Sequence, residues 1–93
     1  MNENLSLNMP EISRFYGIII KMYFNDHNPP HFHMEYQDFK AKIEIETGIL
    51  EGKMPRTAIN LGLRWLSDHK EELMENWERM ERKETLNKIE PLI

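Results

Sequence analysis

Two histidines separated by one residue, His31 and His33, are the side chains of this 93-residue chain best suited to chemistry. They follow Pro29 and Pro30, and a proline fixes its own φ and drives the residue before it to an extended conformation. Side chains two apart in a strand point to the same face. The sequence therefore predicts a shaped loop that delivers two imidazoles, side by side, outward into solvent-reachable space.

Acid–base catalysis is the first chemistry that this pair suggests. An imidazole with a pKa of about 6.5 populates both protonation states near neutral pH, so one ring can accept a proton while the other donates one. Such a pair suits metal-independent cleavage of an RNA phosphodiester bond. In that interpretation His31 and His33 are the catalytic acid and base. Lys42 stabilises charge on the phosphate, and Glu44 orients His31.

A metal site is the second interpretation, because imidazoles supported by carboxylate oxygens suit zinc or nickel-like ions. Beside His31 and His33, the candidate ligands are Glu44 first, then Glu35 or Asp26, and His27. However, Lys42 is predicted next to His33 and would repel a divalent cation at short range. The sequence therefore predicts neither a metal nor another cofactor.

Two alternatives need no reaction at all. The histidines and their neighbours can form a solvated sheet face held by cross-strand ion pairs. The chain can also be a noncatalytic binding module, since aromatic and basic side chains make strong contacts with partners and anions. The candidate binding residues are Arg14, Lys21, Tyr23, His27 and Trp65. Trp65 falls beside the main apolar stripe of its predicted helix, whereas Trp77 falls on that stripe and is expected to pack inward.

Alternating apolar and polar residues predict the strands that must hold these side chains, over 15–24, 31–36 and 39–46, with a shorter one over 49–53. A two-residue turn at 37–38 fixes the register of the hairpin. It places His31 opposite Glu44, and His33 opposite Lys42, on the polar face.

Apolar residues recur at helical spacing from Pro55 to about residue 80, and Asp68 and Glu71 have the spacing of a cap for a second helix. The predicted fold is α+β: a curled antiparallel sheet of three to four strands, packed by one long or kinked C-terminal helix. We expect residues 1–8 to be an unpacked leader and residues 9–93 to form one domain.

Composition limits the possible partners and compartments. The net charge of −4 argues against binding duplex DNA through a general basic surface. The absence of cysteine excludes disulfides and thiolate metal sites and fits a reducing compartment. Neither a membrane span nor a secretory signal is indicated, so a cytoplasmic location is expected.

Four segments of the chain resemble a known family. They are Met-Pro-Glu-Ile-Ser-Arg-Phe-Tyr-Gly-Ile-Ile-Ile at 9–20, the loop and strand at 26–33 with Pro-Pro-His-Phe-His, Lys-Ala-Lys-Ile-Glu-Ile at 40–45, and Glu-Glu-Leu-Met-Glu-Asn-Trp at 71–77. Together they resemble the small prokaryotic family known as domain of unknown function 4160, from Met9 to about Leu92. The resemblance implies a toxin-like component of a type II toxin–antitoxin module, its biochemical activity open, with a small cognate antitoxin-like protein as partner. RNA is a candidate target because of the histidine pair, not because of the resemblance. The competing class is a noncatalytic adaptor or the neutralising half of the pair.

Overall fold

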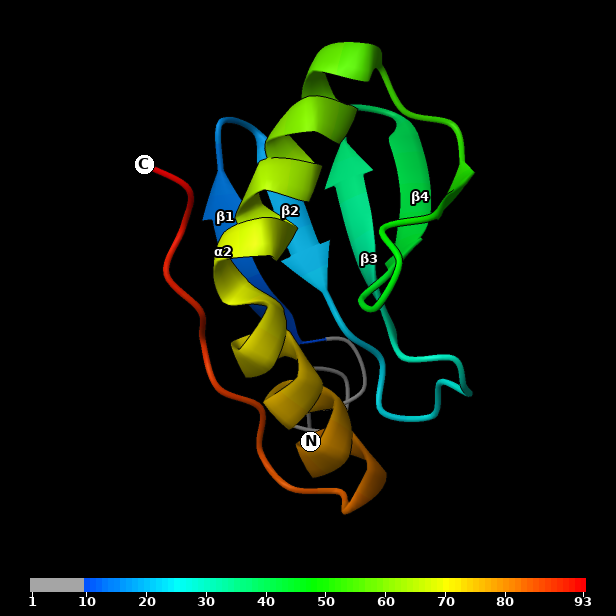
Figure 1. Cartoon of the computed structure of the whole chain (residues 1–93), viewed down its shortest axis with the longest axis vertical. Coiled ribbons are helices and arrows are strands. Elements are labelled where there is room, and N and C mark those ends of the chain that lie inside the picture. Colours follow the sequence, from blue (N-terminus) through cyan, green and yellow to red (C-terminus); the bar gives the residue numbers. More distant parts are fainter. Residues whose placement is uncertain (1–9) are drawn as a thin grey trace, which may run out of the picture.

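The computed structural model describes residues 10–93, which form an antiparallel sheet with one long helix across one face (Figure 1). The elements in chain order are β1 (Glu11–Phe15), β2 (Ile18–Lys21), β3 (His31–Tyr36), β4 (Phe39–Glu44), β5 (Leu50–Gly52) and α2 (Arg56–Glu81). Each strand pairs with the next one along the chain. The α+β class and the C-terminal helix are as predicted.

The sheet has five strands rather than the three to four expected, because the strand predicted over 15–24 is the second half of a hairpin. Tyr16 and Gly17 form its turn and both have positive φ values, 51° and 82°. Two successive positive φ values are typical of the tight turns that join twisted antiparallel strands. Gly17 adopts this conformation without a steric penalty, whereas Tyr16 does so against its preference, which is why the sequence pattern concealed the turn.

The central hairpin of β3 and β4 has the predicted register throughout. His31 pairs with Glu44, His33 with Lys42, and the apolar Phe32 with Ile43 on the other face. This register follows from the two-residue turn and from the need to bury every second side chain. The polar face of the sheet is thereby fixed along both strands.

The helix α2 covers the apolar face of the sheet and is kinked at His69, where φ and ψ are −130° and 26°. Near Gly62 the helix lies very close to the sheet. A Cβ atom added at Gly62 would be only 2.9 Å from the sulfur of Met34. Such an approach needs the smallest residue. Phe32, Ile43 and Trp65 are fully buried in the cluster of apolar side chains that fills this interface.

The segment that follows α2 runs back along the helix beside β1 (Figure 1). Ile89 and Leu92 are buried, and the N–H of Ile89 donates to the carbonyl of Ile12 (2.8 Å). The buried side chain of Asn76 makes two hydrogen bonds of 2.9 Å with the backbone of Asn87. The tail therefore docks on β1 and α2 through buried apolar side chains and backbone hydrogen bonds.

No helix among the described residues is both long and apolar enough to cross a membrane. The predicted leader, residues 1–8, lies outside the part of the chain that the structure describes.

Candidate metal centre

The segment between β2 and β3 brings Asp26 to the end of the sheet where the two histidines lie. Its start is anchored by Met22, whose side chain is buried and whose N–H donates to the carbonyl of Pro10 (3.3 Å). The N–H of Asp26 donates to the carbonyl of Tyr23 (3.2 Å), which closes a tight turn. The carboxylate is thereby held close to β3, seven residues before His33 in the chain.

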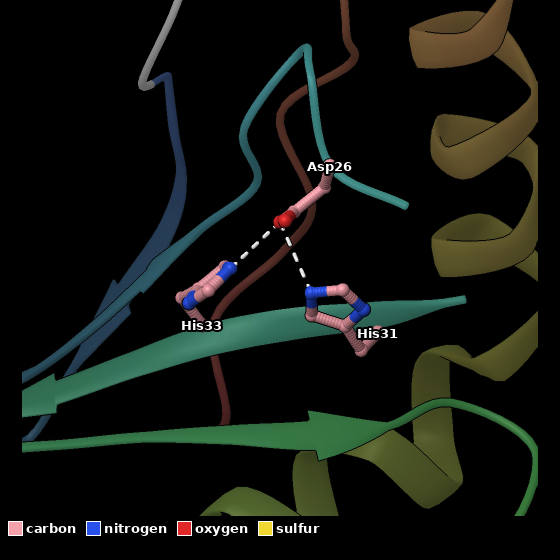
Figure 2. Close-up of side chains that lie close together, drawn as sticks. All are labelled: Asp26, His31 and His33. Atoms are coloured by element: carbon pink, nitrogen blue, oxygen red, sulfur yellow. Dashed lines mark hydrogen bonds and ion pairs between the residues drawn. The ribbon is translucent and has the colours of Figure 1, made fainter. Parts of the chain in front are cut away.

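Asp26 contacts both histidines through one carboxylate oxygen (Figure 2). Its Oδ2 lies 2.7 Å from Nε2 of His33 and 3.0 Å from Nε2 of His31. The two imidazole centroids are 5.1 Å apart. These three side chains offer ligand atoms that all lie within 4.8 Å of one another, as the donors of a metal site must.

The two rings share a face of β3, as predicted, but only one of them is open to solvent. His33 is half-buried, whereas His31 is only 3% exposed, and its ring centroid lies 5.3 Å from that of Trp77 in α2. The expectation that both rings are solvent-reachable is therefore wrong for His31. Residue alternation gave the face of the strand correctly but contained no information about the loop and the helix that cover its first residue.

The hydrogen bonds of His31 leave one nitrogen facing a carboxylate. Its Nδ1–H donates to the carbonyl of Pro29 (2.8 Å), since a carbonyl can only accept. In the neutral ring Nε2 then carries a lone pair, and it faces Asp26 Oδ2 at 3.0 Å. Nε2 is buried and has no hydrogen-bond partner, because the contact with Asp26 is close but not aligned as a hydrogen bond. Two acceptors this close are stabilised by a positive charge between them, which a proton or a metal ion can supply.

His33 has its ring against Tyr23, with the centroids 4.2 Å apart. Burial lowers the pKa of His33 from its ordinary value, and this effect outweighs the hydrogen bond and the charge of Asp26, which act in the opposite direction. The neutral form of His33 is thereby favoured. A neutral imidazole is the form that binds a metal.

The other two residues of the predicted catalytic set have different partners. Lys42 Nζ forms an ion pair with Glu51 (3.2 Å), and Glu44 accepts a hydrogen bond from the hydroxyl of Thr47 (2.8 Å). Glu44 therefore neither orients His31 nor supplies the carboxylate of the cluster. The carbonyl of Pro29 orients His31 instead, and Asp26 supplies the carboxylate of the cluster.

Two of the predicted anion-binding side chains are already paired with carboxylates. Arg14 binds Glu11 (2.7 Å), and the Arg14 guanidinium lowers the pKa of that carboxyl below its usual value. Lys21 lies 3.3 Å from Glu35. Their positive charges are therefore offset before any ligand arrives.

The remaining candidates for partner binding differ in position. Trp65 is fully buried and donates its indole N–H to the carbonyl of Glu90 (2.8 Å), so its predicted role as a contact residue is wrong. Its ring packs against Phe15 of β1 and Phe32 of β3, with centroid distances of 5.5 and 5.6 Å, so Trp65 faces the sheet and only its indole N–H reaches the C-terminal tail. His27 is exposed and lines a cavity next to His31. Tyr23 lies beside the Asp26–His31–His33 cluster, because its ring contacts the ring of His33.

Comparison with known proteins identifies the family of this chain. Residues 17–78, more than half of the chain, match the model of a domain of unknown function, DUF4160. The chain belongs to this family. No curated protein and no solved structure gives a match to the DUF4160 chain. The matched span contains Asp26, His31 and His33.

Sequence reasoning had named Asp26 among the possible ligands of this DUF4160 domain but had preferred Glu44. Cross-strand pairing puts the Cα atoms of His31 and Glu44 opposite each other, and this is correct. The Glu44 side chain is instead hydrogen-bonded to Thr47, in the turn that follows β4. Asp26 stands immediately before the His-Asn-Pro-Pro turn, which brings the chain back over the strand, and this position is the sequence signal that could have favoured it over Glu44.

Proposed function

We propose that this DUF4160 domain binds a divalent transition-metal ion, zinc or iron(II), through Asp26, His31 and His33, and that the ion is catalytic. The observation that carries the proposal is the approach of His31 Nε2 to Asp26 Oδ2, at 3.0 Å and without hydrogen-bond alignment. A buried nitrogen lone pair that faces a carboxylate is costly unless a cation compensates it.

The spacing of the three donors supports a metal ion as that cation. Ligand atoms about 2.0–2.2 Å from one ion lie roughly 3 Å apart when they subtend a right angle and roughly 3.5 Å apart at the tetrahedral angle. The separations in the cluster are 2.7 and 3.0 Å. Two imidazoles and one carboxylate are also the donor set of many mononuclear zinc and iron(II) centres. The hydrogen bond from His31 Nδ1–H to Pro29 supplies the outer support that fixes the ring of a ligating histidine.

The number of ligands supports a catalytic rather than a structural ion. Structural zinc sites use four protein ligands, whereas catalytic sites use three and leave a position for water or substrate. His31 also lines a cavity of about 280 Å³ that opens beside the cluster. An ion held in this way would polarise a substrate oxygen or activate water.

The same geometry disfavours the acid–base pair expected from the sequence. A general acid or base needs a nitrogen within reach of the substrate, and both nitrogens of His31 are directed at protein atoms. The toxin–antitoxin role and the small partner protein remain predictions from the family resemblance, and action on RNA remains a prediction from the histidine pair. A metal centre is compatible with each of them.

Zinc titration of the protein without any histidine tag tests the proposal. We expect one equivalent of zinc to bind, and cobalt(II) to give the visible absorption bands of a low-symmetry site. Asp26→Asn and His33→Ala should each weaken binding by at least about 100-fold, since even the outer partners of ligands are worth about 10- to 100-fold.

His69 provides the matched control because it is the other histidine paired with a carboxylate, Glu72. His69→Gln should bind zinc as the wild type does. The proposal is wrong if the wild type binds no zinc in the micromolar range, or if His69→Gln loses as much affinity as His33→Ala. Circular dichroism of each variant establishes that it is folded.

A further inference from the structure

We propose that the cavity beside His31 is the substrate pocket of the metal centre and that it binds a phosphate group. This inference rests on the proposed function, because the cation held by Asp26, His31 and His33 is one of its two positive poles. The other pole is Lys42 on the neighbouring strand. The opposing surfaces of the pocket and their charges determine the kind of ligand that fits.

Three parts of the chain enclose the cavity, whose volume is about 280 Å³. One wall is the turn at 27–29, which follows the ligand Asp26 directly. The second wall is β4, through Lys42 and Glu44, and the third is the segment 49–51 that leads into β5. His31 lines the same space, so a molecule in the cavity lies next to one of the three proposed metal ligands.

The charged side chains that line the cavity differ in whether they are available to bind a ligand. Glu44 already accepts a hydrogen bond from Thr47. Glu51 pairs with Lys42, but its side chain is 76% exposed and can turn into solvent without breaking another contact given by the structure. The ammonium group of Lys42 has three N–H donors. Within residues 10–93, the ion pair that it forms is the one with Glu51. Lys42 is therefore available to an anion.

A phosphate group satisfies both poles at once. Its several oxygens can bind a metal ion on one side and an ammonium on the other, as in many sites where a cation and a lysine share a phosphate. The volume corresponds to roughly nine water molecules at about 30 Å³ each, which accommodates a phosphate and one attached ring. Ile49 and Leu50 offer an apolar surface for that ring.

The test begins with the protein alone, so that the two proposals can fail separately. Zinc affinity is measured first without phosphate, in the wild type and in Lys42→Gln, Glu51→Gln and Lys40→Gln. Absence of zinc binding overturns the proposed function and this inference together. Lys42→Gln should bind zinc at least as tightly as the wild type, because Lys42 lies opposite His33 and repels a cation there. Each protein is therefore saturated with zinc before phosphate is added, so that later differences belong to the pocket.

Inorganic phosphate is then titrated calorimetrically into protein that carries one equivalent of zinc. We expect Lys42→Gln to bind phosphate at least about tenfold more weakly, because it loses a charge-assisted hydrogen bond. Glu51→Gln should bind it about threefold more tightly, because it removes the carboxylate that competes for Lys42. Lys40 is exposed on the same strand and does not line this cavity, so Lys40→Gln should bind as the wild type does.

The inference is overturned if zinc binds but Lys42→Gln and the wild type have the same phosphate affinity, or if phosphate binds equally well without zinc. A ribonucleoside monophosphate and a dinucleotide with one internal phosphodiester distinguish the two sources of a phosphate group. Tighter binding of the monophosphate assigns the pocket to small phosphate esters. Tighter binding of the dinucleotide assigns it to an RNA backbone.

Discussion

Asn76 and His31 are both buried polar side chains, but the structure completes the hydrogen bonding of one and not of the other. Asn76 has no exposure, and its amide donates to the carbonyl and accepts from the N–H of Asn87. His31 is 3% exposed and donates once, to Pro29, while its second nitrogen faces Asp26 without a hydrogen bond. The amide oxygen and nitrogen of Asn76 both have partners, whereas Nε2 of His31 has no hydrogen-bond partner and can accept a positive charge.

This difference separates a structural role from a chemical one. A buried polar group with all its partners contributes to stability and specifies the path of the chain. A buried group with one partner missing lowers stability unless something else binds there. Asn76 therefore explains how the tail is held, whereas the unpartnered nitrogen of His31 is the reason we propose a ligand site at this end of the sheet.

The largest expected effect is stabilisation of the folded state by zinc. At a free zinc concentration 100 times Kd, the free energy of unfolding should rise by about 2.7 kcal/mol. For a chain of this size that raises the midpoint of thermal unfolding by roughly 10–20 °C. Scanning calorimetry should show the shift in the wild type and in Asn76→Ala, but not in Asp26→Asn. A shift in Asp26→Asn equal to that of the wild type would remove the distinction between the two buried side chains.

The second largest expected effect is the loss of stability when the buried side chain of Asn76 is removed. Asn76→Ala removes both hydrogen bonds to Asn87 and should lower the free energy of unfolding by about 2 kcal/mol. Urea denaturation followed by circular dichroism measures this loss, and zinc affinity should stay unchanged. If Asn76→Ala weakened zinc binding as well, the tail and the metal centre would be one unit rather than two.

The smallest effect is the pH dependence of the metal-free protein. Burial lowers the pKa of His33 in the folded state, so the unfolded chain takes up this proton at a higher pH than the folded chain does. The stability contributed by neutral His33 is thus present above its ordinary pKa of about 6.5 and is lost as the pH falls below that value. Denaturation midpoints at pH 7.5 and 5.5 should differ more for the wild type than for His33→Gln. Equal differences would show that His33 has no part in the acid sensitivity.

The pattern of residues predicted the fold where alternation and helical spacing act over many positions. The register of β3 with β4 followed from a two-residue turn, and the inward position of Trp77 followed from its place on the apolar stripe. The β1–β2 hairpin was missed because Tyr16 adopts a positive φ that its side chain does not favour. Trp65 was misplaced because the residues that surround it, Phe15 and Phe32 in the sheet and Glu90 in the tail, are far away in the sequence.

The candidate site was predicted in part, for a related reason. The shared face of His31 and His33 is a property of one strand and can be read from their spacing. The choice of Asp26 over Glu44 depends on the path of an irregular loop, which has no periodicity. The burial of His31 depends on Trp77, forty-six positions further along the chain. Contacts between distant segments are set by packing, and a local pattern does not encode them.

The docking of the C-terminal tail on β1 has a consequence for solubility. The N–H of Ile89 and the ammonium of Lys88 occupy backbone carbonyls of Ile12 and Glu11, at the outer margin of the sheet. An uncovered margin of this kind is a template for strands from other molecules. Truncation of the last residues should therefore do more than remove apolar contacts, since it would expose a strand edge on which other molecules can pair and polymerise.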